Sequence, residues 1–122
     1  MTDEPTLRVR VHSVPEAVVV VAEGDLDLGS APTLRGRSRA VLADRPGALI
    51  VDLGGIAFCG SAGLQVLAEL AAVAETGDVP FAVVADRHSV LRVLRLTRLD
   101  EVVQLHRTVD AARDWLRRRP PS

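Results

Sequence analysis

The pattern of apolar and polar positions begins with two strand-like segments. Residues 7–12 alternate apolar and polar side chains, which is typical of a strand with one exposed face. Residues 17–22 form an unbroken apolar run rich in valine, which is typical of a strand buried on both faces. Residues 13–16 separate them as a short turn, so the pattern predicts an opening antiparallel hairpin. Residues 24–29, a run of glycine, aspartate and leucine, predict a loop.

Strands and helices then alternate to the C-terminus. Ser30 stands two residues before Pro32, which predicts a helix with Ser30 as its cap and Leu42 near its end. Gly54 and Gly55 predict a flexible turn after the third strand. The periodicity also predicts strands at residues 48–53, 80–85 and 102–105 and helices at residues 61–76, 88–96 and from Thr108 onward.

This order of elements predicts the fold class. A strand pair followed by alternating helices and strands gives an α/β domain with a mixed, mostly parallel sheet, an N-terminal antiparallel hairpin and about four α-helices. A chain of 122 residues is enough for one domain. We expect that domain to span residues 1–122, with its core at about residues 6–117.

The predicted helix at residues 61–76 is apolar on nearly every side. Helical spacing gives an inward stripe, yet further apolar residues fall outside it. The stripe consists of Leu64, Leu67, Ala68, Ala71 and Ala74, and the residues outside it are Val66, Leu70 and Val73. Such a helix is either buried between the sheet and a neighbouring helix or turned toward a partner protein. The sequence leaves both explanations open.

Composition and charge exclude several classes of protein. Hydrophobic residues make up 48% of the chain and aromatic residues only 2%, so the core must be built from aliphatic side chains. A net charge of −1, with no tyrosine and one tryptophan, gives no support to direct binding of nucleic acid. The N-terminus does not resemble a signal peptide, and the longest apolar run, residues 17–22, is too short to cross a bilayer. We therefore expect a cytoplasmic protein without membrane contact.

Candidate catalytic and metal-binding residues are few. His12, His88 and His106 lie in separate predicted elements, and Cys59 is the only cysteine, so neither a metal site nor an internal disulfide is expected. No nucleotide-binding loop occurs, and we expect no cofactor. Cys59 and Ser61 are the candidate nucleophiles, but their surroundings lack the G-x-S-x-G pattern of a nucleophile elbow. A Ser- or Cys-dependent enzyme is therefore the least supported alternative.

Ser61 stands out for its position at the start of a predicted helix. A serine there can cap a free backbone N–H group. The same place also suits a phosphate, because free N–H groups and the helix dipole favour an anion by up to ~2 kcal/mol. Gly60 and Gly63 leave space on both sides of the hydroxyl. Both roles, cap and phosphate acceptor, remain open at this point.

Three local patterns give the chain a resemblance to a known family. They are Gly24–Asp27, which is similar to a G-(E/D)-L-D loop, the strand, loop and helix start at Val51–Leu64, and the late helix and turn at Val90–Asp100. In this order and spacing, and over nearly the whole chain, they resemble the STAS domain family and, within it, the bacterial anti-sigma factor antagonists (anti-anti-sigma factors). The resemblance implies a single STAS domain that regulates transcription indirectly through protein–protein interaction and is not an enzyme.

The resemblance also implies a phosphorylation switch. The family signature reads D-S-(S/T)-G-L, and Ser61 falls on its phosphorylated serine, so the chain would be a phosphoprotein. The implied partner is an anti-sigma factor with serine kinase activity, which binds ATP and Mg²⁺ itself, and a phosphatase is a further implied partner. The unphosphorylated antagonist would bind the anti-sigma factor and free the sigma factor. Asp27 matches an acidic loop residue that lies near the phosphorylation site in the family.

The residues expected to contact the partner surround this serine. They are Asp25, Asp27, Gly60, Ser61, Ala62, Gly63, Gln65, Val66 and Glu69. The chain departs from the signature at Gly60, which replaces the aspartate, and at Ala62, which replaces the second serine or threonine. The late turn has Arg98 where a glycine is common. Loss of the aspartate favours an alternative in which the chain is a constitutive STAS scaffold, a subunit of a larger regulatory or transport assembly.

Overall fold

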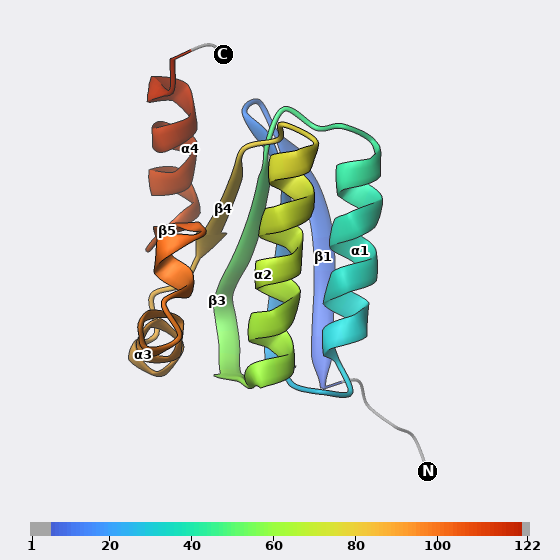
Figure 1. The fold of residues 1–122 in the computed structure, drawn as a ribbon, viewed down its shortest axis with the longest axis vertical. Helices are drawn as coiled ribbons and strands as arrows, with labels where there is room; N and C mark the ends of the chain where they lie inside the picture. Colours follow the sequence, from blue (N-terminus) through green and yellow to red (C-terminus); the bar gives the residue numbers. More distant parts are fainter. Residues whose placement is uncertain (1–5, 121–122) are drawn as a thin grey trace.

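A computed structural model of the chain describes residues 6–120, which form a five-stranded sheet packed with four α-helices (Figure 1). The elements, in chain order, are β1 (Leu7–Val14), β2 (Ala17–Leu26), α1 (Ala31–Ala43), β3 (Leu49–Cys59), α2 (Ser61–Thr76), β4 (Phe81–Val84), α3 (His88–Leu96), the short 3₁₀ helix η1 (Leu99–Glu101), β5 (Gln104–His106) and α4 (Val109–Arg118). This order confirms the predicted alternation of strands and helices. None of the helices in residues 6–120 is long and apolar enough to cross a membrane.

The strands follow one another across the sheet in the order β1-β2-β3-β4-β5. β1 pairs with β2 antiparallel, and every later neighbour pairs parallel. The hairpin turns between Val14 and Ala17, which face each other across the two strands. The sheet is therefore mixed and mostly parallel with an N-terminal hairpin, and the predicted fold class is confirmed.

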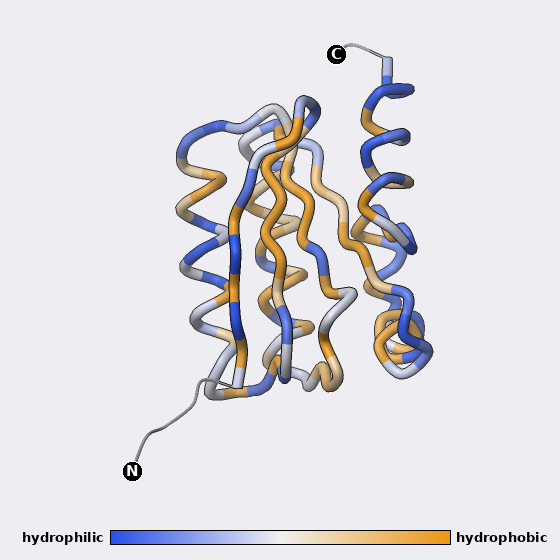
Figure 2. The backbone as a smooth tube through the Cα atoms, turned by 180° about the vertical axis from the view of Figure 1, so that it is seen from behind, coloured by the Kyte–Doolittle hydropathy of each residue, from blue (hydrophilic) through white to orange (hydrophobic). Residues whose placement is uncertain are grey.

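Helices cover the two faces of the sheet unequally. α1, α2 and α3 pack on one face, where their apolar side chains share a cluster with residues of β2 and β3. α4 packs on the other face through the buried Ala112 and the partly buried Trp115 and Leu116. Figure 2 shows this second face, with α4 over one side of the sheet and the apolar middle strands beside it. The valine run of β2 is accordingly buried on both sides, and Val19 and Val20 are both 0% exposed.

β2 and β3 both extend further than the sequence pattern predicts. The predicted loop at residues 24–29 is confirmed only for residues 27–29, because residues 24–26 belong to β2. The predicted turn at Gly54 and Gly55 lies inside β3 and is wrong. The two extensions pair with each other as far as Leu26 and Cys59. Each strand thereby satisfies backbone N–H and C=O groups of the other. The glycines and polar residues of one segment alone cannot reveal this pairing.

Gly24 has a backbone conformation that favours glycine. Its φ is +113°, and a Cβ atom would lie 2.2 Å from the carbonyl oxygen of Thr6. The next residue, Asp25, donates its N–H to the same oxygen at 2.8 Å. The register of β2 against β3 shifts between Gly24 and Asp25, so this glycine sets how the last residues of β2 lie on β3.

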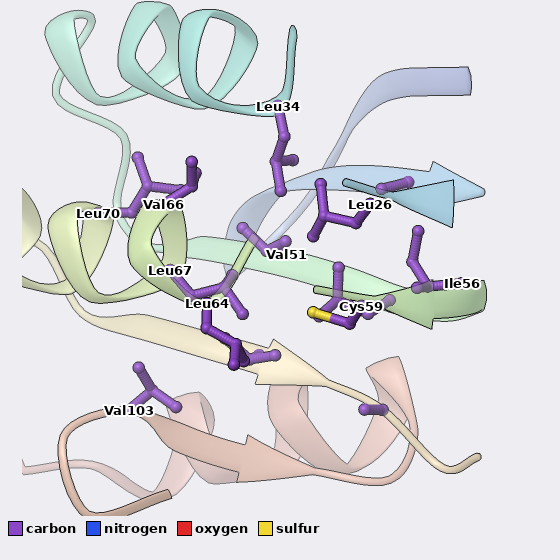
Figure 3. Packing of buried hydrophobic residues seen from close by; sticks show 14 of the residues in the cluster. Leu26, Leu34, Val51, Ile56, Cys59, Leu64, Val66, Leu67, Leu70 and Val103 are labelled. Atoms are coloured by element: carbon purple, nitrogen blue, oxygen red, sulfur yellow. The ribbon is translucent and has the colours of Figure 1, made fainter. Parts of the chain in front are cut away.

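α2 occupies the predicted residues, and its surroundings decide between the two explanations for its apolar surface. Val66 and Leu70 are both 0% exposed, and they share a core cluster with Leu34 of α1. Figure 3 shows these two side chains on the side of α2 toward α1. Burial against α1 therefore explains them, and Val66 is not accessible to a partner in this structure. Ala68, predicted to face inward, is instead exposed.

The C-terminal elements lie close to their predicted positions. α3 occupies the predicted residues, and α4 begins directly after Thr108. β5 begins at Gln104 rather than at residue 102, because η1 intervenes. Arg98 precedes η1 in a left-handed conformation, with φ of 61°, and its guanidinium donates two hydrogen bonds to Glu101 at 2.8 and 3.0 Å. Arg98 therefore adopts the left-handed backbone conformation that glycine adopts most easily, in agreement with the glycine that is common at this turn of the family pattern.

Candidate functional site

The extended ends of β2 and β3 form a platform for the start of α2. Asp25 lies opposite Phe58, and Leu26 lies opposite Cys59, in the parallel pairing. The N–H of Gly60 donates to the carbonyl oxygen of Leu26 at 2.9 Å. The loop after β2 and the first turn of α2 are therefore neighbours at the carboxyl edge of the parallel strands, the edge at which α/β sheets commonly bind ligands.

Ser61 is the first residue of α2, and its side chain is exposed. Gly60 holds the N-cap position with an extended backbone (φ −90°, ψ −179°), and no side chain caps the helix. The first turn of α2 also contains no acidic residue. Ser61 therefore does not act as the cap, and the positive end of the helix dipole lacks a compensating side chain in that turn.

Gly63 lies on the inner side of the first turn of α2. It is buried, and a Cβ atom at this position would lie 2.5 Å from Cγ of Leu26 and 3.3 Å from Sγ of Cys59. Only the absence of a side chain lets the helix approach β2 and β3 so closely. Gly63 is therefore not accessible in this structure, and it seats the helix on Leu26, whose side chain lies among the core residues in Figure 3.

The loop from Asp25 to Ser30 is held by its own polar groups. The Ser30 hydroxyl donates to the carbonyl oxygen of Asp25 at 2.8 Å and accepts the N–H of Asp27 at 2.9 Å. In return, Asp27 Oδ1 accepts the N–H of Ser30 at 3.0 Å. Ser30 has the predicted N-cap position of α1, but its side chain makes no capping bond to that helix. The loop bonds instead fix Asp27 in a half-buried place and leave Asp25 exposed.

Glu69 of α2 is tied to α1. Its carboxylate oxygens accept hydrogen bonds from Arg35 Nε at 2.7 Å and from Arg39 Nη1 at 3.0 Å. The hydrogen bond from Arg35 is the main cause that holds the pKa of Glu69 below its ordinary value. Gln65, one turn nearer to Ser61, is exposed. Of these two predicted contact residues, Gln65 is accessible, whereas Glu69 already joins two helices.

Leu28 and Phe58 are candidate contact residues that are not among the individually predicted ones. Leu28 is 83% exposed in the loop after β2, and Phe58 is 55% exposed opposite Asp25. A pocket of about 480 Å³ lies beside Leu28 and is lined also by Asp27 and Thr33. Both residues stand near the carboxyl ends of the paired strands β2 and β3, where exposed apolar side chains favour an interaction site. The sequence held one signal for them, because Leu28 follows two aspartates in a loop and gains nothing from exposure to water.

The two nucleophiles at this place lack the surroundings of a catalytic centre. Cys59 is 7% exposed, and burial raises the pKa of its thiol to about 11, so that little thiolate exists at neutral pH. In the described part of the chain, no hydrogen bond joins Cys59 or Ser61 to a histidine. That part also contains no group of three histidine, cysteine or acidic side chains that could hold a metal ion.

Comparisons with known proteins agree on one family. The family model for the Mlab STAS domain matches residues 9–105. The anti-sigma-F factor antagonist RsfB of Mycobacterium tuberculosis is 35% identical over 111 residues, which cover 90% of this chain and 88% of RsfB. The crystal structure of an anti-sigma factor antagonist from Mycobacterium paratuberculosis is 34% identical, with a TM-score of 0.84 over 96% of this chain and 99% of that chain. The crystal structure of TM1081 from Thermotoga maritima shares the fold at 23% identity, with a TM-score of 0.80 over 90% of this chain and 95% of that chain.

Proposed function

Since the chain belongs to the STAS domain family, among its anti-sigma factor antagonists, we propose that it binds an anti-sigma factor and thereby frees a sigma factor. Proteins of this kind regulate another protein and are not enzymes, in agreement with the expectation from the sequence. The proposed contact is the docking surface, which we define as Asp25, Asp27, Leu28, Phe58, Gly60, Ser61, Ala62, Gln65 and Glu69.

One observation carries this proposal. The first turn of α2 has no acidic residue, and Gly60 offers it no capping side chain. The exposed Phe58 lies beside Gly60, since a Cβ atom there would be 3.2 Å from its ring, and the exposed Leu28 follows β2 at the same edge of the sheet. Two carboxylates lie near Leu28 in the sequence: Asp25 at the end of β2 and Asp27 in the loop that follows. A free helix terminus, apolar side chains in water and fixed negative charges together form a surface that gains stability when another protein covers it.

Leu28 and Phe58 supply the apolar part of the proposed contact. Full burial of a leucine or phenylalanine side chain is worth roughly 1.5–3 kcal/mol, and a large part of both side chains remains available for burial. Neighbouring Gly60 and Ala62 are small, so a partner can approach the backbone closely. We therefore expect Leu28 and Phe58 to contribute more to affinity than the polar residues at the rim.

Asp25 and Asp27 supply the charged part. Asp25 is exposed, and Asp27 is held in place by its bond with Ser30. A partner with arginine or lysine side chains opposite these carboxylates would be attracted and oriented by charge complementarity. The contact should therefore weaken as the salt concentration rises, since salt screens exposed charges.

We further propose that phosphorylation of Ser61 turns the contact off. The anti-sigma factor would hold ATP and Mg²⁺, Ser61 Oγ would take the γ-phosphoryl group, and ADP and the hydroxyl proton would leave. An exposed hydroxyl at the first residue of an uncapped helix suits a phosphate. A phosphoserine carries roughly −1.5 to −2 charges, and a partner surface that fits the neutral Ser61 would have to desolvate that charge without pairing it. A phosphatase would restore the binding state.

A constitutive contact is the second candidate, and Gly60 favours it. The residue at the N-cap position has no carboxylate with which to contact a kinase. In this case, the docking surface would bind its partner without a switch, as a scaffold subunit of a larger regulatory or transport assembly does. The two candidates share the surface and differ only in whether charge at Ser61 controls it.

The docking surface can be tested by calorimetric titration of the chain with its cognate anti-sigma factor. The double variant Leu28→Ala/Phe58→Ala should bind at least about tenfold more weakly, which corresponds to about 1.4 kcal/mol. Leu96→Ala is the matched control, because Leu96 is 71% exposed and lies outside the docking surface. Equal affinity of the double variant and the unchanged chain would reject this surface, and no binding by the unchanged chain would reject an anti-sigma factor as its partner.

The switch requires a separate test. The chain is incubated with the anti-sigma factor, ATP and Mg²⁺, and the phosphate is mapped by mass spectrometry. We expect phosphate on Ser61, none in Ser61→Ala, and at least about tenfold weaker binding by Ser61→Asp, because a carboxylate is then buried in the contact without a partner. An unphosphorylated Ser61, together with normal binding by Ser61→Asp, would leave the constitutive contact as the function.

A further inference from the structure

A second surface lies at the other end of α2. A groove of about 790 Å³ is walled by the last turns of α2, the segment after η1 and the end of α4. Its residues include Glu75, Asp78, Asp100 and Trp115. Glu75 lies fourteen residues beyond Ser61 along the helix, which is about 20 Å. We propose that this groove binds a basic segment of a partner protein, with an arginine side chain over Trp115, while the docking surface at Ser61 remains accessible.

The charges of the groove favour a cationic occupant. Glu75, Asp78 and Asp100 are exposed, and the ion pairs found within residues 6–120 include none of them. The other two carboxylates of the groove differ, because Glu16 is paired with arginines of α4 and Glu101 is paired with Arg98. The groove therefore presents unpaired negative charge that an incoming basic side chain can neutralise.

Trp115 shows which kind of cation the groove accepts. The guanidinium carbon of Arg119 lies 5.2 Å from the centroid of the Trp115 ring, in a cation–π contact. Arg119 is exposed and stands one residue beyond α4, with an extended backbone. Because it is held by no ion pair among residues 6–120, an arginine from another protein can replace it on the ring at small cost.

The groove also offers apolar contacts beside this ring. Phe81 and Val103 are buried at its base, and Val102 is 64% exposed at its edge. Acidic residues around an apolar base match a segment in which basic and apolar residues alternate. A purely ionic ligand would leave the exposed apolar surface uncovered, so the mixed segment is the better complement.

The single tryptophan of the chain makes the test direct, because its fluorescence reports on this groove alone. The probe is an end-capped hexapeptide of alternating arginine and leucine, and its control is the same peptide with glutamate in place of arginine. We expect a saturable change in Trp115 fluorescence with the arginine peptide, none with the glutamate peptide, and weaker binding as the salt concentration rises.

Variants locate the binding site. Glu75→Gln/Asp100→Asn should bind the arginine peptide at least about fivefold more weakly, because two unpaired charges are lost. Asp44→Asn/Asp86→Asn removes the same charge outside the groove and should bind as the unchanged chain does. Arg119→Ala should bind about threefold more tightly, because its competing guanidinium leaves the ring.

Three results would overturn the proposal. The first is the absence of a saturable signal with the arginine peptide, and the second is an equal signal with the glutamate peptide. The third is concentration-dependent self-association of the chain in sedimentation experiments that disappears in Glu75→Gln/Asp100→Asn, which would identify a second copy of this chain as the occupant. None of these results depends on whether an anti-sigma factor binds at Ser61.

Discussion

The first turns of α2 and α4 are built in opposite ways. Thr108 caps α4, since its Oγ1 accepts the N–H of Ala111 at 3.0 Å, and Asp110 adds a negative charge in the first turn. α2 has Gly60 at the corresponding position, no capping bond and no acidic residue in its first turn. Both helices begin from an extended residue, so the difference lies in the side chains and not in the backbone.

The difference distinguishes a helix start whose N–H groups are satisfied within the fold from one whose N–H groups remain available for binding. A capped and charged start, such as that of α4, satisfies its own N–H groups and compensates its dipole. The start of α2 leaves both tasks undone, and it lies beside Phe58 at the carboxyl edge of the sheet, the edge at which Leu28 follows β2. An anion or a partner protein can supply what this helix lacks, which is the physical basis of the proposed docking surface.

The largest expected effect comes from Gly63, which seats α2 on Leu26. Gly63→Ala places a Cβ atom 2.5 Å from a side-chain atom of Leu26, so it should lower the free energy of unfolding by about 1–3 kcal/mol. Gly36→Ala is the matched control: no atom lies within 4 Å of its Cβ, and it should raise the free energy by about 0.5–1 kcal/mol. Urea denaturation measures both, and a Gly63→Ala variant as stable as the unchanged chain would show that the helix can move away from the strand.

The cap of α4 gives the next effect. Thr108→Ala removes the bond to Ala111 and should lower the free energy of unfolding by about 1 kcal/mol. Ser61→Ala, at the start of α2, should change it by less than about 0.5 kcal/mol, because Ser61 caps nothing. Thermal unfolding of the two variants side by side checks this contrast. Equal losses would mean that the two helix starts are not different in the way described.

A negative charge at Ser61 should make the two helix starts more alike. Ser61→Asp is expected to raise the free energy of unfolding by about 0.3–1 kcal/mol at low salt, through the helix dipole. Asp110→Asn, which removes the charge from α4, should lower it by a similar amount. Ser61→Asn is the uncharged control. A gain that persists at high salt, or that Ser61→Asn reproduces, would contradict a dipole effect.

The smallest effect is expected from restoring the signature aspartate. Gly60→Asp supplies a capping carboxylate and should raise the free energy of unfolding by a few tenths of a kcal/mol. Its Cβ would lie 3.2 Å from the ring of Phe58, which is exposed and can move. Gly60→Ala adds the same Cβ without a cap and should be the less stable of the two in urea denaturation. The opposite order would show that the contact with Phe58 outweighs the cap.

Periodicity alone located most elements because it is a local property. α2 and α3 begin and end where the spacing of their apolar residues predicts, and Thr108 is the cap of α4. The order of strands and helices was sufficient for the mixed sheet with its N-terminal hairpin. The position of Ser61 at the start of a helix, between glycines, was also readable from the sequence. Each of these features depends on residues within one or two turns of each other.

Contacts between distant segments decided the rest. Gly54 and Gly55 belong to a strand because β2 runs beside them, and Val66 is buried because α1 covers it. Gly63 faces Leu26, which is far away in the sequence. The spacing of residues around Ser61 therefore could not distinguish the role of Gly63 from the role of Gly60. The exposure of Phe58 appears only once the two strand ends are paired, since burial is a property of the packed chain and not of a residue type.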